Sequence, residues 1–483
     1  MFERQLPNLR QNNYSMKILS VLIFLCTSSV GYLYAQSGEV IYSMYCAGCH
    51  GAQLQGNTAA KLIKTEWKYG RGRDAIFRNI KFGIPSTEMI KWGGALKDED
   101  IRALADFIVA AQEIPPNADR PIPESLTTKD YTLKVEKLVT ADIHTPWGIE
   151  FVDAHRALIT ERIGAIRWMV DGKLDPQPIQ GLPKTYAQQA TGGYMDLALD
   201  PSFSKNGWVY FAFSHTRGSP ADKSAEGMTK VVRGRISGHQ WTDEQTLFEV
   251  PDSLTLSGGN RWGGRLMFDT DGYLYFSIGD MARANDSQNP GKPSGKVFRI
   301  HADGSIPKDN PFVGKPGALA ALYSIGNRNV QGIAQHPATG EIWATEHGPM
   351  GGDELNVLKK GANYGWPLIT YGIDYSGEIV SNDTARAGME QPVVVWTPSI
   401  AVCPAEFVTG DLFPRWKNNL LVGALAFEEI RRLVIVNNKV MEQEMILKGV
   451  GRVRDLKIGP DGALYVLLNN PDMVLRISPD KGS

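Results

Sequence analysis

Residues 266–279, LMFDTDGYLYFSIG, contain the pattern that predicts most of this chain: a few alternating apolar residues, a turn rich in Asp and Gly, and a second apolar strand. Further copies lie at 148–160, 196–211, 332–344 and 456–466, with a weaker one at 406–422. The copies are roughly 50 to 75 residues apart, which suits the four-stranded blades of a β-propeller. Six copies therefore predict an all-β six-bladed β-propeller over residues 131–480.

The N-terminal part carries a different signal, Cys46-Ala47-Gly48-Cys49-His50. Two thiols at this spacing can each take one vinyl group of a porphyrin, and the adjacent imidazole can then bind the iron. A chance match, a zinc half-site or a redox dithiol are the alternatives. Zinc would need two more ligands at suitable spacing, and the four Cys and eight His of the chain include no second cluster. We therefore predict a covalent haem c on Cys46, Cys49 and His50.

The residues around this motif have helical spacing at 37–45 and 97–111. Between these stretches, the Pro-containing loop 83–89 could bring the Met89 sulfur to the open face of the iron. The order and lengths resemble a class I cytochrome c. The resemblance implies a small all-α domain over residues 37–112, with His50 and Met89 as the two iron ligands. A His/Met pair would raise the iron's potential and make it an electron carrier.

The first 35 residues predict export from the cytoplasm. An apolar stretch at 18–33 follows Arg10 and Lys17, and a cleavage site near Ala35 would make 1–35 a secretory signal peptide that starts at Met1 or Met16. An uncleaved membrane anchor is the alternative. Haem is attached to this kind of motif outside the cytoplasm, so both signals predict a periplasmic protein, with membrane contact only if the signal is retained.

Composition narrows the class of partners and places a linker. The 483 residues carry 51 Lys and Arg against 52 Asp and Glu, and no basic run occurs, so no nucleic-acid partner is expected. Residues 113–130 are rich in Pro and polar residues and predict a semi-rigid linker between the haem domain and the propeller. A linker of this kind sets the effective concentration of one redox centre at the other.

The least generic segment of the propeller runs from Gly326 to Pro367. Arg328 lies between two asparagines and offers a fixed cation with amide donors, which suits carboxylates or quinone oxygens. Gly-Pro and Gly-Gly turns precede two acidic residues, and carbonyls beside carboxylates suit calcium. Arg452 and Arg454 alternate on one predicted strand and add two cations. Each alone would be a solvated charge, but together they predict a pocket for a polyanion with a metal beside it.

Several motifs resemble one enzyme family over roughly residues 131–480. They are Pro146-Trp147-Gly148, Gly264-Arg265-Leu266, Arg328-Asn329-x-Gln331-Gly332, the block from Glu346-His347-Gly348-Pro349 to Tyr364-Gly365-Trp366-Pro367, and Arg452-x-Arg454-Asp455. Together they resemble the soluble aldose or glucose/sorbosone dehydrogenases that depend on pyrroloquinoline quinone (PQQ). The resemblance implies a six-bladed propeller that oxidises the anomeric hydroxyl of aldoses by hydride transfer to PQQ.

The resemblance also assigns roles to residues. It implies that Arg328, Asn329, Arg452 and Arg454 bind the carboxylates and quinone of PQQ, with Arg328 at the reacting centre. It further implies that the carbonyls of Gly348 and Pro349 bind the calcium that polarises PQQ. A second, structural calcium site is implied for Glu354, Tyr364 and Asp374.

Three positions depart from the family pattern. The family has a general base, a His, just before Gly-Gly-Arg-Leu, whereas this chain has Arg261, which stays protonated and cannot accept a sugar proton. A cofactor-binding Lys is replaced by Ala426, and a Gln by Thr191. We expect Arg261 to bind the quinone acid or an acidic substrate at the catalytic centre. His347 and Asp280 are the candidates for a base that would replace the missing His.

The leading hypothesis is a quinohaem oxidoreductase that oxidises the aldose-type hydroxyl of a sugar through PQQ. Electrons would pass to its own c-type haem and then to a downstream cytochrome or oxidase. The alternative is a calcium-stabilised propeller that binds a carbohydrate or protein partner, has lost dehydrogenase activity and keeps the haem as a relay. A propeller hydrolase is a third hypothesis, which the intact cofactor arginines disfavour.

Overall fold

The computed structural model describes residues 38–63, 73–84, 89–112, 122–186, 192–216, 218–219, 225–257, 260–374, 378–397 and 399–480. The chain divides into two compact units, of which one contains Met1–Ser43 and Leu62–Pro116, and the other Met44–Lys61 and Asn117–Ser483. The predicted signal peptide and Thr191 lie outside the described residues. Across the described ranges, no helix is both long enough and apolar enough to span a bilayer.

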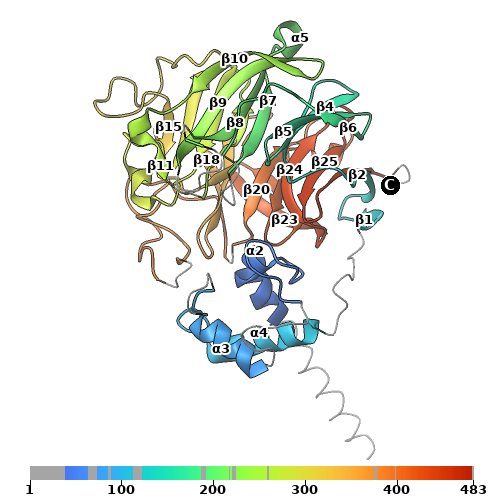
Figure 1. Cartoon of the computed structure of the whole chain (residues 1–483), viewed down its shortest axis with the longest axis vertical. Coiled ribbons are helices and arrows are strands. Elements are labelled where there is room, and N and C mark those ends of the chain that lie inside the picture. The colour runs from blue at the N-terminus through green and yellow to red at the C-terminus, as the bar shows by residue number, and fades with distance from the viewer. Residues whose placement is uncertain are drawn as a thin grey trace, which may run out of the picture. The chain divides into compact units, whose positions relative to one another are not determined.

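The described residues of the predicted cytochrome segment are helical, as expected (Figure 1). They form a helix at 38–45, α2 (Ala47–His50), α3 (Arg73–Phe82) and α4 (Asp98–Ala111). Helix α4 buries Ile101, Leu104 and Ile108, which the helical spacing had placed on one face. Three acidic residues in its first turn favour the positive end of the helix dipole. Helix α3 was not predicted from the sequence.

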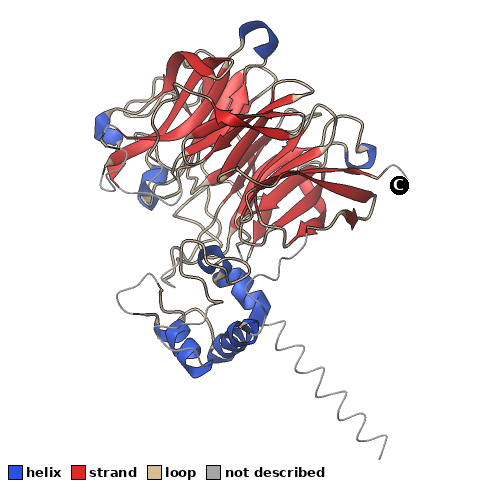
Figure 2. Ribbon diagram, turned by 45° about the vertical axis from the view of Figure 1, so that its right-hand side comes forward, coloured by secondary structure: helices blue, strands red, loops and turns tan. Residues whose placement is uncertain are grey.

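The rest of the described chain is almost entirely strand and loop (Figure 2) and forms six antiparallel sheets. Four sheets have four strands each, which follow one another in chain order. The first contains β3 (Pro146–Phe151), β4 (Arg156–Glu161), β5 (Ala165–Val170) and β6 (Lys173–Pro178), and the second contains β12 (Leu266–Phe268), β13 (Tyr273–Ile278), β14 (Lys296–His301) and β15 (Leu322–Ile325). The third contains β16 (Val330–Gln335), β17 (Ile342–Glu346), β18 (Asp353–Leu358) and β19 (Val394–Trp396), and the fourth contains β20 (Val402–Phe407), β21 (Leu420–Ala424), β22 (Glu429–Val436) and β23 (Lys439–Lys448).

Two sheets have five strands. One runs from β7 (Tyr194–Leu199) through β8 (Val209–Thr216) and β9 (Glu226–Ser237) to β10 (Gln240–Phe248), with β11 (Leu256–Ser257) paired to β9. The other contains β24 (Arg452–Ile458), β25 (Leu464–Asn469), β26 (Met473–Pro479), β2 (Thr132–Val139) and β1 (Ser125–Thr127). Short helical turns, α5 (Phe203–Asn206), η1 (Asp252–Leu254), η2 (Ala284–Gln288) and η3 (Pro414–Trp416), lie in the connections.

Each copy of the sequence pattern forms the first two strands of one sheet: β3–β4, β7–β8, β12–β13, β16–β17, β20–β21 and β24–β25. The second strands are apolar and buried along their length because side chains from both faces pack against neighbouring sheets. Apolar clusters fill the space between each pair of neighbouring sheets, including the last and the first. The prediction of a six-bladed propeller is confirmed.

The last sheet is built from both ends of the propeller sequence. Strand β2 pairs with β26, and β1 pairs with β2, so residues before the first copy of the pattern complete the sixth blade. Strand β1 lies inside residues 113–130, which the sequence predicted to be linker. Tyr131, between β1 and β2, packs edge-on against Phe413 and Trp416 at centroid distances of 5.8 and 5.3 Å.

A register shift recurs near the start of the first strand in five of the six sheets. The residues at these bulges are Trp147, Asp196, Gln331, Cys403 and Arg454. A bulge leaves one residue out of the ladder and can redirect its side chain. The bulge at Arg454 also interrupts the simple alternation that the sequence had suggested for Arg452 and Arg454.

Candidate functional site

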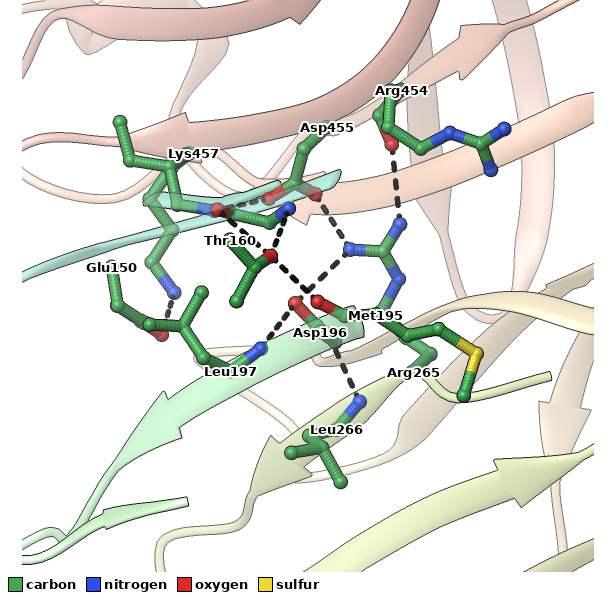
Figure 3. A network of polar contacts seen from close by, with 12 residues as sticks. Glu150, Thr160, Met195, Asp196, Leu197, Arg265, Leu266, Arg454, Asp455 and Lys457 are labelled. Atoms are coloured by element: carbon green, nitrogen blue, oxygen red, sulfur yellow. Dashed lines mark hydrogen bonds and ion pairs between the residues drawn. The ribbon is translucent and has the colours of Figure 1, made fainter. Parts of the chain in front are cut away.

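Residues from all six sheets meet at the buried side chain of Arg265, which directly precedes β12. Figure 3 shows its guanidinium beside Asp196, Asp455 and the Arg454 carbonyl. Its guanidinium contacts the first strand of every other sheet. The contacted residues are, in order along the chain, Trp147, Asp196, Gln331, Cys403, Arg454 and Asp455. One cation therefore joins all the blades at the centre of the propeller.

The carboxylates around Arg265 are fully used by hydrogen bonds. Arg265 Nη1 lies 2.7 Å from Asp455 Oδ1 and 3.4 Å from Asp196 Oδ1. The second oxygen of Asp196 accepts from the Leu266 backbone N–H at 2.9 Å, and that of Asp455 from the Ile149 N–H at 3.0 Å. This centre is a satisfied buried network, which rigidifies the residues attached to it.

Three arginines lie around one buried imidazole beside this centre. The backbone N–H of His347 donates to the Asn329 carbonyl at 3.0 Å, which fixes the start of the loop after β17. Burial and the charges of Arg328, Arg454 and Arg452 lower the pKa of His347 to about 3. Burial and Arg454 also lower the pKa of Arg452 to about 10. The predicted cationic pocket is therefore formed by residues from β24 and the loops at β16 and β17, around a neutral histidine.

The pocket has polar atoms that suit an anionic ligand. His347 Nε2 is buried and makes no hydrogen bond of good geometry among the described residues, although the Val402 backbone lies close enough to act on the ring. Asn329 Nδ2 lies 3.5 Å from His347 Nδ1, at the other side of the same ring. A ligand that carries carboxylates and a hydrogen-bonding ring would satisfy the imidazole and neutralise the arginines. These residues therefore fit PQQ, which the sequence had suggested.

Arg328 also contacts the turn that was predicted to bind calcium. Its Nη1 donates to the Gly348 carbonyl at 2.5 Å and to the His347 carbonyl at 3.1 Å. Position 348 requires glycine because a Cβ there would lie 2.3 Å from the Gly352 carbonyl oxygen. The Gly348 carbonyl oxygen is thus held where it interacts with positive charge.

Two acidic residues lie opposite each other in a small cavity next to this turn. Glu346 on β17 pairs in register with Glu354 on β18, and the cavity wall includes both of them with Tyr364 and Trp366. Burial raises the pKa of Glu354, and Glu346 adds to this effect. Burial likewise raises the pKa of Glu346. A divalent cation would remove this repulsion, so the acids fit calcium chemically.

The other two predicted calcium ligands, Tyr364 and Asp374, do not point free oxygens into the cavity. The hydroxyl of Tyr364 donates to the Val357 carbonyl at 2.7 Å and accepts from the Lys359 N–H at 2.8 Å, so it is used within the fold. Asp374 is exposed and does not line the cavity. In the described part of the chain, no three His, Cys, Asp or Glu side chains are grouped to hold a metal. Calcium here would therefore depend on backbone carbonyls such as those of Gly348 and Pro349.

Arg261 forms an ion pair with Asp280. Arg261 Nε lies 2.6 Å from Asp280 Oδ1, and Asp280 also accepts from Trp366 Nε1 at 2.9 Å and from the Ala282 N–H at 3.0 Å. The Asp280 side chain is 0% exposed. The oxygens of Asp280 are thus occupied by three donors inside the fold, which argues against the suggestion that it is the base. Arg261 thus has a carboxylate partner within the protein, and its binding of the quinone acid or of an acidic substrate stays a prediction.

Comparison with known families identifies the chain at this point. Residues 143–476 match the protein family described as Glucose / Sorbosone dehydrogenase, and residues 34–108 match the family of cbb3-type cytochrome c oxidase subunit III. The chain belongs to the glucose/sorbosone dehydrogenase family, with an N-terminal cytochrome c domain. The family resemblance predicted from the motifs is confirmed.

Individual relatives agree with this family assignment. The chain is 40% identical over 355 residues to an aldose sugar dehydrogenase of Escherichia coli, an alignment that covers 72% of this chain and 93% of that one. It is 30% identical over 282 residues to quinoprotein glucose dehydrogenase B of Acinetobacter calcoaceticus, covering 52% and 56%. The crystal structure of the soluble E. coli aldose sugar dehydrogenase in its apo-form superposes with a TM-score of 0.67 at 38% identity, covering 72% of this chain and all of that one.

The cytochrome c domain of this chain has a haem motif with suitable local geometry. Cys46 is the N-cap of α2, and Cys49 lies about one turn further along that helix. His50 Nδ1 lies 2.7 Å from the Ala60 carbonyl oxygen, which orients the ring as in many metal-binding histidines and assigns Nε2 to the iron. The motif therefore fits a covalent haem. The Met89 carbonyl accepts from the Ile84 N–H at 3.0 Å, while residues 85–88 of its loop lie outside the described ranges.

The residues that meet at the centre of the propeller were not predicted from the sequence. Trp147, Arg265 and Gln331 appeared only as parts of family motifs, without a role. A signal was present, because each stands immediately before the first residue of its copy of the pattern, at Gly148, Leu266 and Gly332. An alignment of the six copies with one another would have placed these residues in one column.

Proposed function

We propose that this chain is a quinohaem sugar dehydrogenase, which oxidises an aldose-type hydroxyl with PQQ and delivers the electrons to its own haem c. The convergence of Arg328, Arg452 and Arg454 around the neutral His347 carries the proposal. Arginines bind carboxylates with fixed geometry, and several together favour a rigid polyanion. Membership of the dehydrogenase family supports PQQ as that polyanion.

The residues of the chain would share the work as follows. Arg328, Asn329, Arg452 and Arg454 would bind the cofactor, and the carbonyls of Gly348 and Pro349 would hold calcium against it. PQQ, when bound, supplies a two-electron acceptor for the sugar hydroxyl. The calcium-fitting acids Glu346 and Glu354 lie next to this turn and would stabilise it once their charge is compensated.

Removal of the sugar proton is the step for which this chain departs from its family. Arg261 stands at the position of the base and is paired with Asp280. His347 is neutral, but its low pKa makes it a weak proton acceptor. We therefore infer slow oxidation of simple aldoses.

The cytochrome c domain would make electron transfer intramolecular. A two-electron acceptor must be reoxidised in single steps by haem, and a tether supplies the haem at a fixed effective concentration. Export through the predicted signal at 1–35 would place the enzyme in the periplasm, where a downstream cytochrome or oxidase would take the electrons.

Haem reduction tests the proposed function. Purified haem-loaded chain is titrated with calcium and PQQ, and the haem spectrum is followed after addition of a panel of aldoses and acidic sugars. We expect a ferrous haem spectrum that requires the sugar, calcium and PQQ together. Reduction that is independent of PQQ, or PQQ that fails to bind, would overturn the proposal.

The Arg261–Asp280 ion pair favours one second candidate, a propeller that binds carbohydrate and no longer oxidises it. In that case calcium and PQQ bind, sugars change the binding equilibrium, and the haem stays ferric with every sugar. The same titration therefore separates the two functions.

A further inference from the structure

We propose that Gln331 is the positioning residue of the cofactor pocket, and that the two ends of its amide orient Arg454 and Asn329 toward the ligand. The inference rests on the proposed PQQ function but concerns a residue to which that function assigned no role. Gln331 is 5% exposed and lies at the bulge that begins β16. It touches residues from β20, from β24 and from the segment that leads into β12.

The oxygen end of the amide faces a cation. Gln331 Oε1 accepts from Arg454 Nη1 at 3.2 Å. The same Nη1 lies 3.4 Å from the Cys403 sulfur, so the guanidinium is held between two acceptors from β16 and β20. Arg454 is thereby fixed in one direction before any ligand binds.

The nitrogen end faces acceptors only. Gln331 Nε2 donates to the Gly263 carbonyl at 3.2 Å and to Asn329 Oδ1 at 3.3 Å. Asn329 Oδ1 also accepts from the Gly263 N–H at 3.2 Å. These two donors require the oxygen of Asn329 to point inward, so its Nδ2 donor must point toward His347.

The amide of Gln331 has only one workable orientation. If it were flipped, its NH₂ would face the Arg454 guanidinium and its oxygen would face two other oxygens. The backbone reinforces this arrangement, because Arg265 donates to the carbonyls of both Gln331, at 2.9 Å, and Arg454, at 3.2 Å. Gln331 thus orients the Arg454 guanidinium and the Asn329 amide N–H toward the same ligand.

Variants at this position separate orientation from stability. Gln331→Glu keeps an acceptor for Arg454 but adds a negative charge and removes the donor to Asn329. Gln331→Met keeps the approximate volume and removes both ends of the amide. Gln335→Glu is the matched control, because Gln335 lies on the same strand and makes its bonds, to Thr270 N–H and the Gly340 carbonyl, outside the pocket.

The measurement is PQQ affinity of the haem-loaded full chain in calcium, at several salt concentrations, together with the urea midpoint of each variant. We expect Gln331→Glu to weaken binding at least tenfold and to reduce its salt dependence, since a new anion cancels one cation. Gln331→Met should weaken binding at least tenfold with unchanged salt dependence. Gln335→Glu should match wild type. A purely structural role would lower the urea midpoint without changing the salt dependence.

Binding within twofold of wild type in both Gln331 variants would overturn the proposal. A double-mutant cycle of Gln331→Met with Arg454→Met, read from urea midpoints without cofactor, decides the case independently of PQQ. Strongly non-additive shifts support the coupling, and additive shifts reject it. If wild type itself binds no PQQ, the proposed function fails, and the cycle still decides whether Gln331 positions Arg454.

Discussion

At position 261 this chain has a guanidinium where the family resemblance implies a proton-accepting imidazole. The Arg261–Asp280 pair has ion-pair geometry with a fully buried carboxylate, so the charge is compensated inside the protein. A compensated cation neither attracts an acid strongly nor removes a proton. The consequence is that the arginines of the proposed cofactor pocket are kept, while the residue at the proposed reacting centre is changed.

We expect Arg261→His to raise the kcat for aldose oxidation by about 10²-fold, because a positioned general base contributes about 10²–10⁴. Asp280 lies where it could orient the new imidazole. The measurement is the initial rate of haem reduction with calcium, PQQ and glucose. Arg261→Gln is the control, since it removes the cation without supplying a base. Equal rates in wild type and Arg261→His would show that the base is not missing.

Glu354 gives the protein a dependence on pH that calcium should remove. Because its pKa is raised in the fold, the folded chain holds this proton at pH values where the unfolded chain has lost it. Its contribution to stability is therefore complete below the ordinary glutamate pKa of about 4 and is lost as pH rises through the raised value.

We predict that the urea midpoint of the calcium-free protein falls as pH increases from about 4 to about 9. Added calcium should reverse the fall, because the cation replaces the proton between the two acids. Glu354→Gln should make the fall less steep, because other buried acids with raised pKa values, such as Glu406, remain. Asp411→Asn, at a carboxylate that is 94% exposed, should leave the profile unchanged. A calcium-free profile that rises over this range would refute the prediction.

At the scale of elements, β1 and β2 complete the last blade from the other end of the sequence. A closed ring of sheets has no exposed edge between its first and last blades, which is the advantage of closure. Tyr131 anchors this junction, because it packs on Phe413 and Trp416 and its hydroxyl accepts from the Arg415 N–H at 2.8 Å.

Tyr131→Ala should lower the free energy of unfolding by about 3–5 kcal/mol, the usual cost of deleting a large buried aromatic side chain. Tyr131→Phe keeps the packing and loses one hydrogen bond, so it should cost about 1 kcal/mol. Urea unfolding followed by tryptophan fluorescence measures both. Similar losses in the two variants would mean that the hydroxyl, and not the ring, holds the junction.

At the scale of the whole molecule, one polypeptide carries a propeller of the glucose/sorbosone dehydrogenase family and a cytochrome c domain. In the proposed function, the haem is tethered to the cofactor pocket by the chain itself. When the haem is tethered to the sugar-oxidising site, the rate constant of haem reduction does not depend on protein concentration.

We expect haem reduction after sugar addition to be first order, with a rate constant independent of protein concentration in stopped-flow measurements. The control mixes a haem-free variant, Cys46→Ala with Cys49→Ala, loaded with PQQ, and haem-loaded wild type without PQQ. Reduction in the mixture should increase with concentration. Concentration dependence in the intact chain would show that the haem is served by collision.

Much of the fold and part of the site could be predicted because their signals are local. Each blade repeats an alternation of apolar residues and a tight turn, and strand pairing within a blade follows from that pattern. The haem motif is five consecutive residues, and the pocket arginines lie in short, distinctive segments. The family resemblance extended these signals to PQQ and calcium, of which PQQ fits the pocket, while Asp374 does not reach the acidic cavity.

What only the tertiary structure decided are contacts between residues far apart in the chain. Arg265 meets Asp455, 190 residues away, and Asp196. Arg261 and Asp280 flank the predicted hairpin 266–279, but their ion pair was not predicted. The sequence by itself determined the blades, the haem motif and which arginines are available to the pocket. Ring closure and the bulges at the first strands determined which of these side chains meet, because a one-residue register shift redirects a side chain and no periodicity records it.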